Sequence, residues 1–299
     1  MKEKKKRQVH TASFWMFILP ALFLYALFML VPLLGTVLYS LTNWDGISVI
    51  YEFVGIKNYI RLFTNDSAFR SSMAVSFRFV ALYTILVNSI ALALAVLLDR
   101  VNKKLKSFIR SVIFMPNVIS LIMVSFIWQF MFTKVYSELA GDGFFPDITW
   151  FSNSATAMVT ILITLIWQSV GYFMVIYVAG IESIDRTYYE AALIDGAGYW
   201  QRTFKITFPL MLPSIIVNIF LSISGAFKTF EIPYLMTRGG PGDSTNLIAY
   251  NIYKEAYLSN HAGYASAKAV VLCVIVMCIA IFQIRAMKRK PANKKSSVF

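Results

Sequence analysis

The feature that most constrains this chain is a series of long apolar runs. The first, from Thr11 to Trp44, contains no charged residue. A helix needs about 20 apolar residues to cross about 30 Å of hydrocarbon. Hydrophobic residues make up 58% of the chain, charged residues make up 14%, and the mean hydropathy is +0.64. A soluble core of this size needs fewer apolar residues, so the sequence predicts an all-α membrane protein.

The apolar runs predict six transmembrane helices. The first run is longer than the apolar part of a signal peptide and has no good small-residue cleavage site, so we interpret it as an uncleaved span. Pro20 and Pro32 are expected to mark its start and a kink. Counts of five or seven spans are the alternatives, since the proline-interrupted first run is the easiest to miscount. The six expected spans are Phe14–Leu41, Phe77–Leu98, Ile109–Phe132, Ala155–Gly180, Ile206–Phe230 and Ala265–Arg285.

The distribution of basic residues predicts the orientation of the spans. The net charge of +13 first suggests a nucleic-acid partner, but most basic residues lie in short runs that flank apolar spans, which favours a membrane-lipid surface and no nucleic acid. Nineteen lie on the side of the N-terminus: five in the N-terminal tail, five between the second and third spans, three in residues 186–206, and six at the C-terminal end. The opposite loops contain six. Both termini and residues 186–206 are therefore expected in the cytoplasm.

One polar stretch interrupts the apolar pattern between the fourth and fifth spans, Glu190–Pro213, with the sequence EAALIDGAGYWQRTFKITFPLMLP. Its first residues favour a helix, Gly196 and Gly198 interrupt that helix, and Tyr199–Phe208 reads as a second short helical run before Pro209. The pattern predicts a helix–turn–helix on the membrane surface, where such an element can transmit force to a soluble partner. An ordinary amphipathic connector is the alternative interpretation.

The motif EAA, followed by DGA and by an aromatic run that ends in I-x-x-P-x-x-x-P, resembles the coupling loop of ABC importer permeases. The resemblance is strongest to the carbohydrate-uptake branch, the family of the maltose transporter membrane subunits. Phe208 departs from the leucine that is usual there. Further matches to this branch lie at Phe53–Tyr59, Thr237–Gly242 and Gly263–Ala265. The residues that the resemblance assigns to the coupling loop are Glu190, Ala191, Ala192, Asp195, Gly196, Ala197, Phe204 and Pro209.

The resemblance implies the six transmembrane helices of the type-1 ABC importer permease fold with a cytoplasmic coupling-helix loop. It implies four parts of the chain: a cytoplasmic basic tail at 1–13, the first transmembrane helix and outer loop at 14–70, the permease core at 71–285 with the coupling loop at 186–206, and a cytoplasmic tail at 286–299. The implied location is a bacterial cell membrane. The implied partners are a homologous second permease, two ATP-binding cassette ATPase subunits, and an extracellular or periplasmic sugar-binding protein. ATP and Mg²⁺ would bind to the ATPases, and this chain would bind no cofactor.

The sequence lacks the usual signatures of an enzyme. It has no Walker-type P-loop, no H-E-x-x-H and no G-x-S-x-G, and Cys273 and Cys278 have no metal-type spacing, so we expect no catalytic residue and no metal site. Charged residues near the outer ends of spans are expected to anchor the helices at the interface, with ion coupling as the alternative. These residues are Arg78, Lys228, Glu231 and Lys268, of which Lys228 and Glu231 could pair on one helix face.

A sugar site needs aromatic faces and a few hydrogen-bonding groups in an apolar wall. By position, the resemblance places a substrate path along the fourth and fifth spans, at Gln168, Ser169, Tyr172, Ser222, Gly225, Ala226 and Thr229. Close helix packing is the alternative for such small-residue faces. Asn88, Trp128 and Gln129 are weaker candidates. The expected function is a permease subunit for a carbohydrate, an oligosaccharide. The alternatives are the same architecture importing glycerol-3-phosphate or another small solute, an ATP-independent secondary carrier, and a membrane enzyme.

Overall fold

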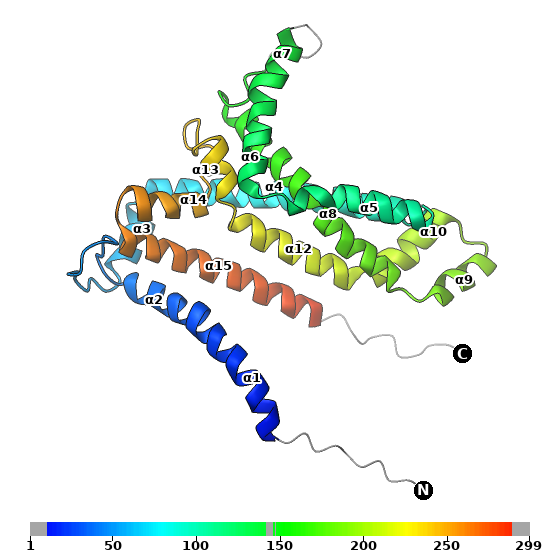
Figure 1. The fold of residues 1–299 in the computed structure, drawn as a ribbon, viewed down its shortest axis with the longest axis horizontal. Helices are drawn as coiled ribbons and strands as arrows, with labels where there is room; N and C mark the ends of the chain where they lie inside the picture. The colour runs from blue at the N-terminus through cyan, green and yellow to red at the C-terminus, as the bar shows by residue number, and fades with distance from the viewer. Residues whose placement is uncertain (1–10, 142–145, 147, 289–299) are drawn as a thin grey trace. The chain divides into compact units, whose positions relative to one another are not determined.

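The computed structural model describes residues 11–141, 146 and 148–288. Within these residues the regular structure consists of helices, and one isolated β-bridge joins Thr42 to Phe53. The expected all-α membrane fold is therefore confirmed. Most of the two expected tails, at 1–10 and 289–299, lies outside the described residues. Figure 1 shows the helices, whose bounds are α1 Thr11–Tyr25, α2 Val31–Tyr39, α3 Lys57–Thr64, α4 Ser67–Leu98, α5 Lys103–Val118, α6 Leu121–Phe130, α7 Tyr136–Gly141, α8 Ser154–Glu182, α9 Arg186–Ile194, α10 Tyr199–Arg202, α11 Phe208–Leu210, α12 Leu212–Phe227, α13 Glu231–Met236, α14 Ile248–Tyr253 and α15 Ala262–Lys288.

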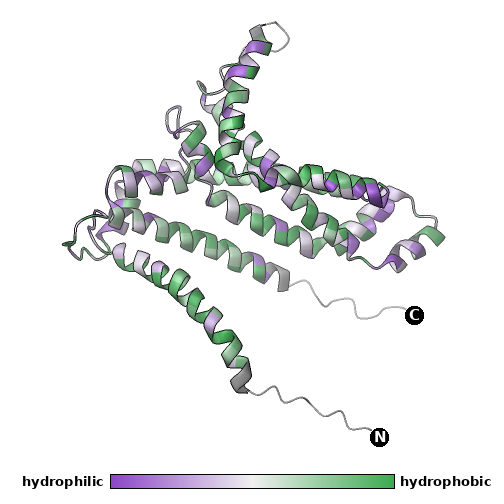
Figure 2. Ribbon diagram, in the orientation of Figure 1, coloured by the Kyte–Doolittle hydropathy of each residue, from purple (hydrophilic) through white to green (hydrophobic). Residues whose placement is uncertain are grey.

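Among the described residues, five helical segments are long and apolar enough to cross a membrane: Phe14–Tyr39, Ser67–Leu98, Ser154–Glu182, Leu212–Met236 and Ala262–Arg285. A sixth is present if α5 and the helix after it form one broken span. Hydrophobic residues cover α1, α2 and most of α15, whereas hydrophilic residues gather around α9 and α10 (Figure 2).

The predicted third span, Ile109–Phe132, is not one straight helix. Helix α5 ends at Val118, Ile119 and Ser120 adopt extended backbone angles, and the helix then resumes with its axis turned by 95°. Pro116 lies in the last turn of α5 and has no N–H to donate, which weakens the helix just before it ends. Apolar residues on both sides keep the mean hydropathy high across Pro116, Asn117 and Ser120, and for that reason composition alone predicted a continuous helix.

A capping residue determines where the second span begins, and a proline changes the helix type within the first. The second span begins at Ser67 instead of Phe77, because the Asp66 carboxylate caps it by accepting a hydrogen bond from the Phe69 N–H at 2.7 Å. In the first span, a wider π-helical turn at Ala26–Leu30 precedes Pro32. A proline cannot donate to the carbonyl four residues earlier and its ring clashes with that carbonyl, so a wider turn relieves the contact. The expected kink at Pro32 is thus a π-helical turn. Pro20 does not mark the start of the span, because it lies inside α1, which begins at Thr11.

Packing divides the chain into two compact units. The first contains the residues up to Asn65 together with Ile252–Val271, and the second contains Asp66–Asn251 together with the residues from Leu272 onward. The four functional parts expected from the sequence are a different kind of division and remain predictions.

The core of the second unit is a bundle in which α4 packs against α8 and α12, and α5 packs against α8. The α5–α8 contact is very close, because a Cβ at Gly171 would overlap the backbone carbonyl of Ile113. Such close approach of helix backbones is typical of packing in membranes.

Buried polar side chains connect three helices of this bundle. The Tyr177 hydroxyl on α8 donates to the Asn88 amide oxygen on α4 at 2.7 Å, and the Asn88 amide nitrogen donates to the Ser222 hydroxyl on α12 at 2.9 Å. The weak substrate candidate Asn88 is therefore a structural link between helices.

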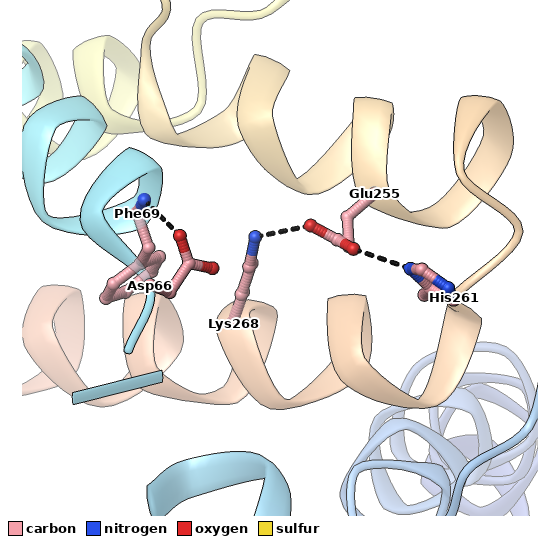
Figure 3. A network of polar contacts seen from close by, with 5 residues as sticks. All are labelled: Asp66, Phe69, Glu255, His261 and Lys268. Atoms are coloured by element: carbon pink, nitrogen blue, oxygen red, sulfur yellow. Dashed lines mark hydrogen bonds and ion pairs between the residues drawn. The ribbon is translucent and has the colours of Figure 1, made fainter. Parts of the chain in front are cut away.

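In the first unit, an ion pair is buried against the start of α15. The Lys268 ammonium, 1% exposed, lies 2.6 Å from a carboxylate oxygen of Glu255, whose other oxygen lies 2.9 Å from the His261 ring (Figure 3). Burial alone would raise the pKa of Glu255, but hydrogen bonds and charge from Lys268 and His261 outweigh it and hold that pKa below its ordinary value. The interpretation of Lys268 as an anchor that reaches into the interface is therefore wrong, because its ammonium is buried and paired.

Candidate functional site

The candidate site residues lie in two places in the second unit: the polar connection after α8, and a cavity among α4, α8 and α12. The connection consists of α9 and α10, at the end of the bundle where α5 begins (Figure 1). Both helices lie where the sequence predicted a helix, a glycine turn and a second helical run.

Helix α9 is delimited by a cap at each end. At its start, the Asp185 carboxylate accepts a hydrogen bond from the Thr187 N–H at 3.0 Å, which also lowers the pKa of Asp185. At its end, Gly196 adopts a left-handed conformation with φ +73°. The Ala197 N–H donates to the Ala192 carbonyl at 2.8 Å, and the Gly196 N–H donates to the Leu193 carbonyl at 3.1 Å. This pair of hydrogen bonds is a Schellman motif, which ends a helix with a fixed exit direction.

Acidic and large apolar side chains are exposed side by side on the surface of α9 and the turn after it. Glu190, Ala191 and Asp195 are exposed. Next to them, the apolar side chains of Leu193 and Ile194 are also exposed, and Ile194 is 88% exposed. Large apolar residues at the tip of a polar loop are typical of a protein interaction site.

The second half of the connection is attached to the bundle. The Tyr199 hydroxyl donates to the Val96 carbonyl at the end of α4 at 3.1 Å, and the hydroxyls of Tyr189 and Thr207 lie 3.0 Å apart. Phe204 is exposed, and its ring packs edge to face against that of Phe208, with 5.2 Å between the ring centroids.

Pro209 explains the local backbone after α10. A π-helical turn, Thr203–Thr207, precedes it, with the Phe208 N–H bonded to the Thr203 carbonyl. This is the same wider turn that precedes Pro32, and it has the same physical cause.

A cavity of 340 Å³ brings together most of the predicted substrate path. Gln168, Ser169, Tyr172, Gly225 and Thr229 line it, together with the apolar side chains of Leu121, Leu165, Phe173 and Leu221. Tyr172 is 38% exposed, and Gln168 reaches toward α5 through a 3.4 Å hydrogen bond to the Asn117 carbonyl. Helices α8 and α12 therefore present an aromatic face and polar groups to one space.

Two residues of the predicted path do not line this cavity. Ser222 is buried and its hydroxyl is held by Asn88, while Ala226 is buried in the helix packing. Ser169 lies at the cavity wall, but its hydroxyl is 2.8 Å from that of Tyr83 and donates to the Leu165 carbonyl. For Ser222 and Ala226 the packing interpretation fits the structure better.

Lys228 and Glu231 also line the cavity, and sequence reasoning placed them elsewhere. They are three residues apart in sequence but do not lie on one helix, because α12 ends at Phe227 and α13 begins at Glu231. In the part of the chain that the structure describes, neither forms an ion pair. Lys228 lies between Ala226 and Thr229 of the small-residue face, and Glu231 lies two residues past Thr229, a position that could have suggested a role in the path.

The described residues contain no group of three or more His, Cys, Asp and Glu side chains arranged to hold a metal ion. The absence of a metal site and of a cofactor remains a prediction.

Together, a set of membrane-length helices, a largely apolar cavity with a few polar groups among them and an exposed capped helix at one end are typical of a membrane transport component. Residues 100–287 match the family model described as "Binding-protein-dependent transport system inner membrane component". The chain belongs to this family, the inner membrane permeases of binding-protein-dependent ABC importers.

Individual proteins agree with this assignment. The chain is 32% identical over 291 residues to the probable starch degradation products transport system permease protein of Thermoanaerobacterium thermosulfurigenes, covering 97% of this chain and 99% of that protein. It is 30% identical over 281 residues to the multiple sugar-binding transport system permease protein of Streptococcus mutans, covering 92% and 95%. The fold matches a chain of a bacterial alginate ABC transporter in complex with an alginate pentasaccharide-bound periplasmic protein, with a TM-score of 0.80, 20% identity and coverage of 92% and 94%. The resemblance drawn from EAA and DGA is thus confirmed.

Proposed function

We propose that this chain is the permease subunit of an ATP-driven importer for a carbohydrate, an oligosaccharide, and that it forms half of the translocation path. The main support for the proposal is helix α9, on which Glu190, Leu193 and Ile194 are exposed. The turn at Gly196 fixes where this helix ends, and we call α9 with this turn the coupling arm. A soluble subunit that binds the coupling arm can move it as a rigid body.

Energy for transport would come from partner subunits. Two ATPase subunits would bind ATP and Mg²⁺ and receive α9 and its equivalent in a homologous second permease. An external sugar-binding protein would deliver the substrate. The alginate transporter, which has the same fold, is known in complex with such a loaded protein, and this supports the proposal by analogy. The excess of basic residues around α9, the α4–α5 connection and both tails supports a cytoplasmic position for all of them.

The 340 Å³ cavity supports a neutral, hydroxyl-rich substrate. Tyr172 offers a ring for stacking, while Gln168 and Thr229 offer hydrogen-bonding groups. Sugar transporters among the relatives support the same class of cargo.

Glycerol-3-phosphate is a second candidate, because the Lys228 ammonium lines the cavity and could attract a phosphate. However, the Glu231 carboxylate lines the same cavity and would repel it. The two charges balance, so the lining favours a neutral sugar.

The test is to purify the chain from its native membrane in mild detergent and to measure ATP hydrolysis with candidate sugars and loaded binding protein. We expect an ATPase and a second permease to accompany the chain, and a sugar-loaded binding protein to stimulate hydrolysis. Glu190→Lys should abolish that stimulation while the complex stays inserted in the membrane. A chain that purifies alone and transports sugar in liposomes without ATP would refute the proposal.

A further inference from the structure

A cavity of 260 Å³ lies between helices α9 and α10 and the ends of the membrane-length helices α4 and α8. Arg100, just past the end of α4, Ile181, at the end of α8, and Arg202 on α10 contribute to its lining. A second cavity of 690 Å³ shares Asp99, Ile181, Tyr189 and Arg202 with the first.

The two cavities are strongly basic. Six cationic side chains line one or the other, against three carboxylates, those of Asp99, Glu182 and Glu190. Two of the carboxylates are already used, because Lys106 lies 2.8 Å from Glu182 and 3.9 Å from Asp99. The remaining cations, Arg100, Lys103, Arg110, Arg186 and Arg202, form no ion pair among the described residues.

Arg202 gives the most direct indication of a missing ligand. Its Nε is buried and has no hydrogen-bond partner within the described structure. A buried N–H on a charged group without an acceptor is costly, and a guanidinium is suited in shape to a phosphate. The Arg100 guanidinium lines the same cavity and lies 3.6 Å from the centre of the Tyr199 ring, so stacking fixes its position.

The position of the cavity at the ends of α4 and α8 favours a lipid as the source of a phosphate. Its lining begins at Val96, within the last turn of the apolar helix α4, and includes the last turn of α8. The ends of membrane-length helices lie at the level of lipid headgroups. The exposed residues that suit a protein partner, Leu193 and Ile194, lie about 12 Å further along α9 from Arg186. We propose that Arg100 and Arg202 bind the headgroup phosphate of an anionic phospholipid, which links α10 to the end of α4.

This inference rests on the proposed function, because a lipid that fixes α10 would stabilise the coupling arm through which the ATPase acts. Bound anionic lipid should therefore increase coupled hydrolysis. Basic pockets between transmembrane helices on the cytoplasmic side are known to recognise anionic headgroups.

The experiment uses the intact transporter complex in nanodiscs of phosphatidylcholine, alone or mixed with phosphatidylglycerol. Lipid retained by the complex is measured by native mass spectrometry, and hydrolysis stimulated by the loaded binding protein is measured in parallel. The variants are Arg202→Gln and Arg100→Gln, and the matched control is Lys104→Gln. Lys104 is an exposed cation between Lys103 and Lys106 that lines neither cavity.

We expect the wild type and the control to retain phosphatidylglycerol selectively, and Arg202→Gln to bind it about tenfold more weakly, since the variant loses the charge and the paired donors of the guanidinium. Equal retention of both lipids by the wild type, or equal loss in the Lys104→Gln control, would overturn the proposal. If Arg202→Gln releases the ATPase subunits equally in both lipids, the arginine contacts the ATPase and the lipid proposal is wrong. Because retention is measured directly, a complex without stimulated hydrolysis would contradict the proposed function and still decide the lipid site.

Discussion

The conformation of Gly196 makes a quantitative prediction about coupling. With φ +73°, the residue lies in the left-handed region, where an L-residue other than asparagine costs about 1–2 kcal/mol. A Cβ added there meets no atom within 4 Å, so backbone strain is the whole cost. If the ATPase receives α9 in this conformation, Gly196→Ala should weaken ATPase docking by a factor of about 5–30. Gly196→Asn should have a much smaller effect, because asparagine tolerates this region.

Gly198 provides a matched control two residues away. Its φ of −67° and ψ of 166° suit any residue, and a Cβ there also meets no atom within 4 Å. Docking is measured by titrating the ATPase onto the permease complex in nanodiscs, together with sugar uptake in proteoliposomes. Gly198→Ala should match the wild type in both. Equal affinities for Gly196→Ala and Gly198→Ala would show that the Schellman turn plays no part in docking, as would a Gly196→Asn variant as weak as Gly196→Ala.

Three further perturbations test other parts of the structure. Gly171→Ala should lower the melting temperature of the subunit in detergent, because its Cβ would overlap the backbone of α5, whereas Gly225→Ala, which meets no atom within 4 Å, should melt like the wild type. Tyr172→Ala should raise the sugar concentration needed for uptake several-fold while hydrolysis stays coupled to transport, and unchanged uptake kinetics would assign this ring to packing alone. Because the pKa of Glu255 is held below its ordinary value of 4.5, its pairing with Lys268 should stabilise the first unit fully above pH 4.5 and less as the pH falls below it; Glu255→Gln should melt lower at pH 7 and lose this acid dependence.

Sequence reasoning succeeded where the signal is local. Residues that favour a helix, two glycines and a proline within one stretch predicted α9, its turn and the helical run that begins at Tyr199, and long apolar runs predicted the membrane-length helices. The first signal depends on the backbone preferences of neighbouring residues, and the second depends on the number of apolar residues needed to cross the hydrocarbon. The Schellman turn at Gly196 is a direct consequence of such a preference.

The sequence could not predict features that depend on distant partners. Lys268 is buried because Glu255, thirteen residues earlier, lies opposite it, and nothing near Lys268 in the chain indicates this. Ser222 and Gly225 occupy the same small-residue face, yet Asn88, far away on α4, binds one of them while the other lines the cavity. The break after Val118 lies in a run whose mean hydropathy is high, and the direction of the helix after Pro116 and Asn117 depends on packing that hydropathy does not describe.

The contacts of the second unit form a continuous connection from α9 to the candidate substrate cavity. Tyr189 and Tyr199 bind the start of the helical segment that leads into α12 and the end of α4, respectively. Further into the bundle, Asn88 joins α4 to α12 at Ser222, and Gly225, one turn beyond Ser222, lines the cavity. Because a close-packed helix moves largely as a unit, a displacement of α9 that tilts α12 against α4 must either carry this hydrogen-bonded contact with it or break it. If it breaks, Gly225 on α12 moves relative to Tyr172 on α8, and these two residues line the cavity from different helices.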